Sequence, residues 1–241
     1  MHLLLVALAG VNLPSSQVNR LPIGRIVSLD RRKLDTAGDS LFYSSPRLVT
    51  HADDSFLAAL TALYAERLKA GDAVLDLMTS HVSHLPPDLR LARVDGHGMN
   101  EEELAANPRL ATWTCHDLNT VPRLPFAATG AYDAILCCAG IQYLEEPEAV
   151  FAECARALTP QTGQLIVSFT DKFFYEKAIS GWRERGMATR AKLVRDYMRA
   201  AGGFKDICVE GSGTSLLAQL GSISGLGGDP FCVVIGTRDD S

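Results

Sequence analysis

The chain has 241 residues, of which 47% are hydrophobic and 21% are charged, and its formal net charge is −5. This length suits one large α/β domain with an ample core, and the composition is ordinary for a soluble globular protein. The negative balance gives no electrostatic reason to expect a nucleic acid or an anionic membrane as a partner, so we predict no nucleic-acid binding.

The six cysteines and the hydropathy pattern indicate a protein of the cell interior. The cysteines form no C-x-x-C pair, and five of them lie in apolar runs. Small buried thiols in a reducing compartment account for this pattern better than a disulfide framework does. No apolar run approaches the ~18 residues that suggest a membrane-spanning helix. We therefore predict an intracellular protein without a membrane span.

The N-terminal region has a composition of its own. The opening MHLLLVALAG imitates the apolar part of a secretory signal, but it lacks a basic start and is short for such a signal. No acidic residue precedes Asp30, whereas Arg20, Arg25 and several serines do. This composition suits the remnant of an organelle transit peptide and an ordinary arm equally well. We divide the chain into an N-terminal arm over residues 1–40 and a single domain over residues 41–241.

Further along, the pattern alternates between helices and strands. Amphipathic spacing and capping residues predict helices at residues 54–71, 100–108, 147–158, 172–185 and 189–201. Short apolar runs predict strands at residues 74–77, 92–96, 111–115, 132–138, 164–169, 205–211 and 231–238. Such alternation favours a parallel sheet covered on both faces. The last two strands have no clear crossover helix between them, so we expect them to form an antiparallel hairpin with a long loop.

Three stretches of the chain resemble the class I S-adenosylmethionine-dependent methyltransferases, and among these the type 11 group. AVLDL at residues 73–77 resembles the first motif of the class. CHDLNTVPRLPF at residues 115–126, followed by YDAIL, resembles its adenine-contacting stretch and fourth strand, and ARALTPQTGQLIVSF at residues 155–169 resembles the next helix, turn and strand. The resemblance covers residues 54–237. It implies a Rossmann-like, doubly wound seven-stranded sheet, mostly parallel with a C-terminal antiparallel hairpin, and S-adenosylmethionine as the cofactor.

A tighter resemblance concerns segments outside these motifs. Residues 30–54, 82–90 and 96–108, together with the shorter DLN and AGGF, are similar to a little-characterised methyltransferase-domain family of cyanobacteria, algae and plants. Members of that family share an unusual first loop without glycine. The resemblance implies a fold, a cofactor and a location in the cytoplasm or the plastid stroma, and it implies no particular reaction.

The loop after the first strand departs from the usual pattern of the class. Asp76 lies near the end of that strand, and Met78, Thr79 and Ser80 stand where glycines are usual. Glycine is usual there because the backbone approaches the ligand closely and adopts a positive φ. In compensation, the two hydroxyls can hydrogen-bond to a carboxylate and Asp76 can receive an ammonium. The methionine part of the cofactor offers both groups.

Further cofactor contacts are expected at the ends of the second and third strands. The acid that usually binds the ribose falls on Gly98, so Asn100 either accepts one ribose hydroxyl, caps the following helix, or does both. Asp117 is placed to accept the adenine amino group and the Leu118 amide to bond the ring, with simple turn formation as the alternative. The cofactor residues expected from the resemblance are Asp76, Met78, Thr79, Ser80, Gly98, Met99, Asn100, Asp117, Leu118 and Cys138.

Catalytic residues leave a weak signal in this class. Methyl transfer is an in-line displacement on an activated sulfonium, which proximity and alignment accelerate, so a general base is optional. The candidates for catalysis are His81, His84 and Tyr143. The candidates for substrate binding, some of them on a lid segment before residue 54, are Tyr43, Arg47, His51, Gln142, Tyr143 and Phe169. No acid–histidine signature accompanies the two histidines, so we predict no metal site.

Two functions fit these observations. The first is S-adenosylmethionine-dependent methyl transfer to a small-molecule acceptor. The second is a catalytically inactive methyltransferase-fold domain that acts as a binding or assembly partner of another protein, and it predicts a crevice filled by Met78 or Met99. A nicotinamide-dependent oxidoreductase is disfavoured because no G-x-G-x-x-G follows a strand.

Overall fold

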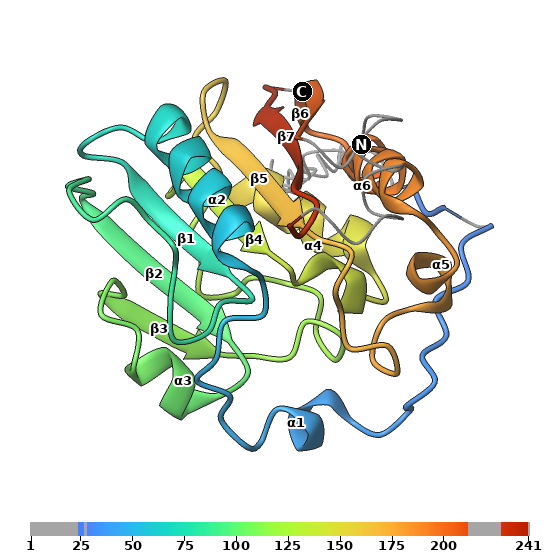
Figure 1. Ribbon diagram of the computed structural model, residues 1–241. Helices are drawn as coiled ribbons and strands as arrows, with labels where there is room; N and C mark the ends of the chain where they lie inside the picture. Colours follow the sequence, from blue (N-terminus) through green and yellow to red (C-terminus); the bar gives the residue numbers. More distant parts are fainter. Residues whose placement is uncertain (1–23, 27, 212–227, 241) are drawn as a thin grey trace, which may run out of the picture.

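The computed structural model describes residues 24–26, 28–211 and 228–240. Its centre is a seven-stranded sheet in the order β3-β2-β1-β4-β5-β7-β6 (Figure 1). The strands are β1 Ala73–Leu77, β2 Arg93–Gly98, β3 Thr112–Cys115, β4 Ala134–Cys138, β5 Gln164–Phe169, β6 Phe204–Glu210 and β7 Cys232–Arg238. Neighbours from β3 to β5 are parallel, and β7 pairs antiparallel with both β5 and β6. The predicted fold class is confirmed. The hairpin loop was predicted over residues 211–228, and its residues 212–227 lie outside the described residues.

Helices cover both faces of the sheet (Figure 1). α2 (Asp54–Arg67) packs on one face, and α4 (Pro147–Ala157) and α6 (Met187–Ala201) pack on the other. Within β1, Val74 belongs to the apolar cluster that includes α2, whereas Leu75 belongs to the cluster that includes α4 and α6. This division follows from the strand itself, because successive side chains of a strand point to opposite faces.

Short helices lie in the connections between these elements. They are α1 Asp39–Phe42, α3 Glu101–Ala105, the 3₁₀ helix η1 Ile141–Tyr143 and α5 Ser180–Arg183. In the part of the chain that the structure describes, no helix has the length and apolar content that a membrane crossing needs.

The helix predicted over residues 172–185 is wrong for most of its length, because only α5 is helical there. We call residues 28–53 the strap. The amides of Ser180 and Gly181 donate to backbone carbonyls of the strap, at 2.8 and 2.7 Å. These amides are therefore bonded to a distant segment rather than to the preceding turn. An amphipathic pattern in the sequence does not distinguish the two outcomes.

The strap packs on the domain through apolar and ionic contacts. Leu29 is 6% exposed and lies in the same core cluster as α4 and α6. Lys177, whose side chain is 1% exposed, forms an ion pair with Asp39 of the strap at 3.2 Å. Residues 28–40 thus lie against the domain, while residues 1–23 of the predicted arm are outside the described residues.

Candidate functional site

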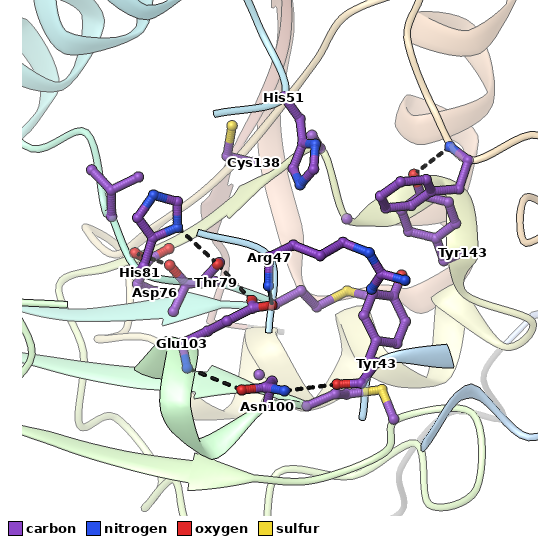
Figure 2. A pocket seen from close by; sticks show the side chains of 18 of the residues that line it. Tyr43, Arg47, His51, Asp76, Thr79, His81, Asn100, Glu103, Cys138 and Tyr143 are labelled. Atoms are coloured by element: carbon purple, nitrogen blue, oxygen red, sulfur yellow. Dashed lines mark hydrogen bonds between the residues drawn. The ribbon is translucent and has the colours of Figure 1, made fainter. Parts of the chain in front are cut away.

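A cavity of about 310 Å³ lies at the carboxyl ends of β1, β2, β3 and β4 (Figure 2). In doubly wound sheets, ligands bind where the strand order reverses, and here β1 and β4 are adjacent at that point. Phe169 does not line the cavity; it is fully buried, with its ring 5.0 Å from that of Trp182. All other predicted site residues line it: Tyr43, Arg47, His51, Asp76, Met78, Thr79, Ser80, His81, His84, Gly98, Met99, Asn100, Asp117, Leu118, Cys138, Gln142 and Tyr143.

The loop after β1 passes through a left-handed residue and then follows β2. Met78 has φ +58°, a conformation that costs a residue other than glycine ~1–2 kcal/mol. His97, in β2, holds the loop, because its Nδ1 accepts from the Met78 amide at 3.2 Å and its carbonyl accepts from the Thr79 amide at 2.8 Å. Burial lowers the pKa of His97 to about 4, so the ring is neutral and free to accept.

The two hydroxyls of this loop are bonded to acids of the protein. Thr79 Oγ1 donates to Asp76 Oδ2 at 2.7 Å, and Ser80 Oγ donates to Glu103 Oε2 at 2.6 Å (Figure 2). A hydroxyl has a single proton, so neither group can also donate to a ligand carboxylate in this arrangement. The backbone amides of Ser80 and His81 make no hydrogen bond to the described residues.

Asp76 is a buried carboxylate at the floor of the cavity, 4% exposed. Burial raises its pKa to about 6, and hydrogen bonds from the Ser83 and Thr79 hydroxyls oppose this rise. Among the described residues, no basic side chain contributes to that pKa or pairs with the carboxylate. Because burying an uncompensated charge is costly, the position favours a ligand that brings a cation.

Gly98 and the loop after β1 occupy the same space. A Cβ at Gly98 would stand 2.6 Å from the Thr79 carbonyl oxygen and 3.1 Å from Leu104. The acid that usually binds the ribose cannot be placed at this position while the loop keeps its path. The two departures from the class pattern, a loop without glycine and a missing acid, are therefore one structural feature.

Asn100 and Glu103 join three segments around the cavity (Figure 2). Asn100 Oδ1 accepts from the Glu103 amide at 3.0 Å, which confirms the predicted cap, and its Nδ2 donates to the Tyr43 carbonyl at 2.9 Å. Glu103, 8% exposed, was not among the predicted site residues. Its Oε1 accepts from the Arg47 amide at 2.7 Å and its Oε2 from the Ser80 hydroxyl. In a capping box, the acid three residues after the cap bonds back to the helix start; here Glu103 bonds to two other segments instead.

The end of β3 has the turn expected as the alternative there. Asp117 accepts from the Asn119 amide at 2.9 Å and from the Thr120 hydroxyl at 2.8 Å. Asn119, a second residue that the sequence did not single out, donates to Asp39 at 2.8 Å and to the Tyr143 carbonyl at 3.0 Å. The β3 end is thereby tied to the strap and to η1.

Aromatic rings and polar groups of η1 and the segment after β5 form the outer wall. The Tyr143 hydroxyl accepts from the Phe174 amide at 2.9 Å, and burial raises the pKa of Tyr143. Gln142 Nε2 donates to the Ala139 carbonyl at 2.8 Å, which leaves Gln142 Oε1 buried without a partner. Burial lowers the pKa of His51, so this ring is neutral at neutral pH.

The two histidines of the loop after β1, His81 and His84, do not form part of a metal-binding cluster of described residues. His84 has φ +52°, its carbonyl accepts from the Thr61 hydroxyl at 3.0 Å, and burial lowers its pKa. His81 Nδ1 lies 3.2 Å from the Ser80 hydroxyl. Within the described ranges, no group of three or more His, Cys, Asp or Glu side chains is arranged to hold a metal ion.

Comparison with known proteins agrees with this architecture. Residues 90–167 match the family described as a methyltransferase domain. No curated protein matches the sequence. A chain in the complex of the Haloferax volcanii Trm112 methyltransferase activator has a TM-score of 0.57 at 16% identity, over 77% of this chain and 91% of that one. An S-adenosylmethionine-dependent methyltransferase from Archaeoglobus fulgidus has a TM-score of 0.52 at 12% identity, over 77% and 95%.

A third similar structure shows what the fold leaves open. The cyclase SpnF has a TM-score of 0.53 at 19% identity, over 76% of this chain and 82% of that one. A shared fold therefore does not determine the reaction. The sheet order first defines an α/β protein with a Rossmann-like, doubly wound sheet. Within that class, residues 90–167 are similar to the methyltransferase-domain family.

Proposed function

We propose that the cavity binds S-adenosylmethionine and that the protein transfers its methyl group to a small-molecule acceptor. The observation that carries this proposal is the buried, unpaired carboxylate of Asp76 at the point where the strand order reverses. The ammonium of the cofactor is the compensating charge that this position calls for.

The residues of the cavity fit the other parts of the cofactor as well. The amides of Ser80 and His81 are the donors for its carboxylate, in the role that the sequence assigned to hydroxyls. Asp117 and Leu118 lie at the end of β3, where the adenine is expected. Asn100 Oδ1 already caps α3, and its second lone pair is the acceptor that remains for a ribose hydroxyl.

The protein's contribution to the reaction is to position the acceptor and exclude water. When bound, the cofactor supplies an electrophilic methyl group on a sulfonium. Gln142 Oε1 is buried and has no hydrogen-bond partner among the described residues. It can accept a hydrogen bond from the N–H or O–H of the methyl acceptor and so orient the lone pair of that nucleophile. The Tyr143 hydroxyl accepts from a backbone amide, so its own O–H can donate a hydrogen bond to the methyl acceptor. Neutral His51 can take up a proton that the acceptor releases.

The alternative, an inactive domain serving as a binding partner, predicts a filled crevice. Met78 and Met99 both line the cavity, and about 310 Å³ is left between the lining residues. This volume lies within the range of small-molecule sites. It supports ligand binding over a plugged crevice.

Isothermal titration with S-adenosylhomocysteine and S-adenosylmethionine tests the proposal. We expect binding that Asp76→Asn weakens at least ~10-fold, a loss of about 1.4 kcal/mol. Asp88→Asn, the same substitution at an exposed acid, should leave the affinity unchanged. If millimolar ligand produces neither heat nor a thermal shift in the wild-type protein, the proposal is wrong.

A further inference from the structure

Arg47 of the strap brings a positive charge to the cavity without a counter-charge. Its Nη2 donates to the Phe42 carbonyl at 3.0 Å, and its Nη1 is buried with no hydrogen-bond partner. Among the described residues, no carboxylate forms an ion pair with the guanidinium. The guanidinium lies 4.3 Å from the centre of the Phe42 ring and 5.5 Å from that of Phe174. Ring faces attract a cation, but they do not supply the hydrogen-bond acceptors that a buried guanidinium needs.

The other cations in the described part of the strap and its flank are all paired. Arg31 bonds to Glu148 at 2.6 Å, and Lys33 bonds to Asp39 at 2.6 Å. The exposed Arg25 and Arg32 also have acidic partners, at 2.7 Å each. Arg47 is thus the exception among basic side chains that otherwise pair with acids.

Glu103 contacts the backbone of Arg47 but forms no ion pair with its guanidinium. One oxygen of Glu103 accepts from the backbone amide of Arg47 and the other from the Ser80 hydroxyl. This contact fixes the backbone of Arg47 beside the loop after β1. From there its side chain extends toward Tyr43 and Tyr143 (Figure 2).

The compartment around the guanidinium is aromatic. Phe174 lies with its ring centre 6.0 Å from that of Tyr143 and 5.3 Å from that of His51, and all three rings line the cavity. Aromatic walls of this kind pack against a flat, apolar group, whereas the Arg47 guanidinium can bind an oxygen anion. The guanidinium keeps donors for a bidentate pair, because only one of its five N–H groups is used.

We propose that the methyl acceptor carries an anionic oxygen group, a carboxylate or a phosphate, which binds Arg47 while its apolar part lies against Phe174 and Tyr143. This inference rests on the proposed function, because it assigns the acceptor end of the same cavity. It also makes Arg47 the residue that selects anionic over neutral acceptors.

Titrations with three probes test the anion site: benzoate, phenyl phosphate and the neutral benzamide. Each is titrated into the protein with and without saturating S-adenosylhomocysteine. We expect at least one anion to bind 10-fold or more tightly than benzamide, and the two anions separate carboxylate from phosphate as the favoured group. Arg47→Met should abolish this preference, and Arg47→Lys should retain part of it, since a lysine keeps the charge and loses the bidentate geometry. Arg32→Met, at a side chain 87% exposed, is the matched control.

The outcomes separate this inference from the proposed function. If neither anion binds better than benzamide to the wild-type protein, or if Arg47→Met keeps the preference, the anion site is wrong. Unchanged S-adenosylhomocysteine affinity in Arg47→Met shows that this variant is folded. If Arg47→Met is not folded, the preference for anions is compared between Arg47→Lys and the wild type instead. Absence of S-adenosylhomocysteine binding refutes the proposed function, while the titrations without it still report on the anion site.

Discussion

Restoring the acid that is usual at the end of β2 should damage this protein rather than repair it. In Gly98→Ala, the new methyl group would stand 2.6 Å from the Thr79 carbonyl oxygen and 3.1 Å from Leu104. The Thr79 oxygen belongs to the backbone and cannot rotate away. Relief of the clash requires the loop to move, and this movement strains the 2.8 Å bond between the Thr79 amide and the His97 carbonyl.

The magnitude follows from these two contacts. Overpacking of a tight site costs ~1–3 kcal/mol, and the loss of one backbone hydrogen bond adds ~1 kcal/mol. A domain of this size loses ~2–4 °C of melting temperature per kcal/mol, so we expect Gly98→Ala to melt roughly 4–16 °C below the wild type. Gly98→Asp should melt at least as early and should bind S-adenosylhomocysteine less tightly than the wild type.

Thermal unfolding followed by circular dichroism, combined with ligand titration, measures both effects. Gly38→Ala is the control, because its Cβ would meet only the Ser40 hydroxyl at 3.6 Å and its φ is −53°; we expect a change below about 0.5 kcal/mol. If Gly98→Asp is as stable as the wild type and binds the ligand more tightly, the loop does not exclude the acid, and the reasoning fails.

Three further predictions concern buried acids and cations. The pKa of Asp76 is about 6 in the folded state against an ordinary 3.8. The wild type therefore loses stability as the pH rises through this range and the buried carboxyl ionises. The free energy of unfolding of Asp76→Asn should rise by up to ~3 kcal/mol relative to the wild type between pH 4 and pH 7.5. Urea denaturation at the two pH values checks this, and a pH-independent difference would contradict it. Glu103→Gln should lower the unfolding free energy by ~1–3 kcal/mol, since one of its two accepted bonds is lost, whereas the exposed Glu102→Gln should be neutral; equal effects would exclude the joining role. Lys177→Met should cost ~1–3 kcal/mol, because the buried Asp39 keeps only its pair with Lys33 and the partly exposed Asp35 loses its pair. Lys192→Met, at an exposed pair, should cost little. A neutral Lys177→Met would show that the strap is held by its apolar contacts.

The architecture and most of the site could be predicted from the sequence, because both depend on local patterns. Apolar runs identify the strands, and the carboxyl ends of parallel strands meet at one edge of the sheet, so residues as far apart as Asp76 and Asp117 were expected around one cavity. Asn100 was expected to cap α3, and it does, because a helix cap is made by residues three positions apart.

Contacts between distant segments were decided only by the tertiary structure. From the sequence, the Ser80 hydroxyl was expected to be available to a ligand, but in the fold it is bonded to Glu103, 23 positions away. The Arg47 amide bonds to the same carboxylate across 56 positions, and none of the described carboxylates pairs with the Arg47 guanidinium. Residues 172–185 have a helical pattern, yet amides of this segment bond to the strap. In each case a polar group has several partners of similar energy within its local sequence, and the packing of remote elements selects which one it meets.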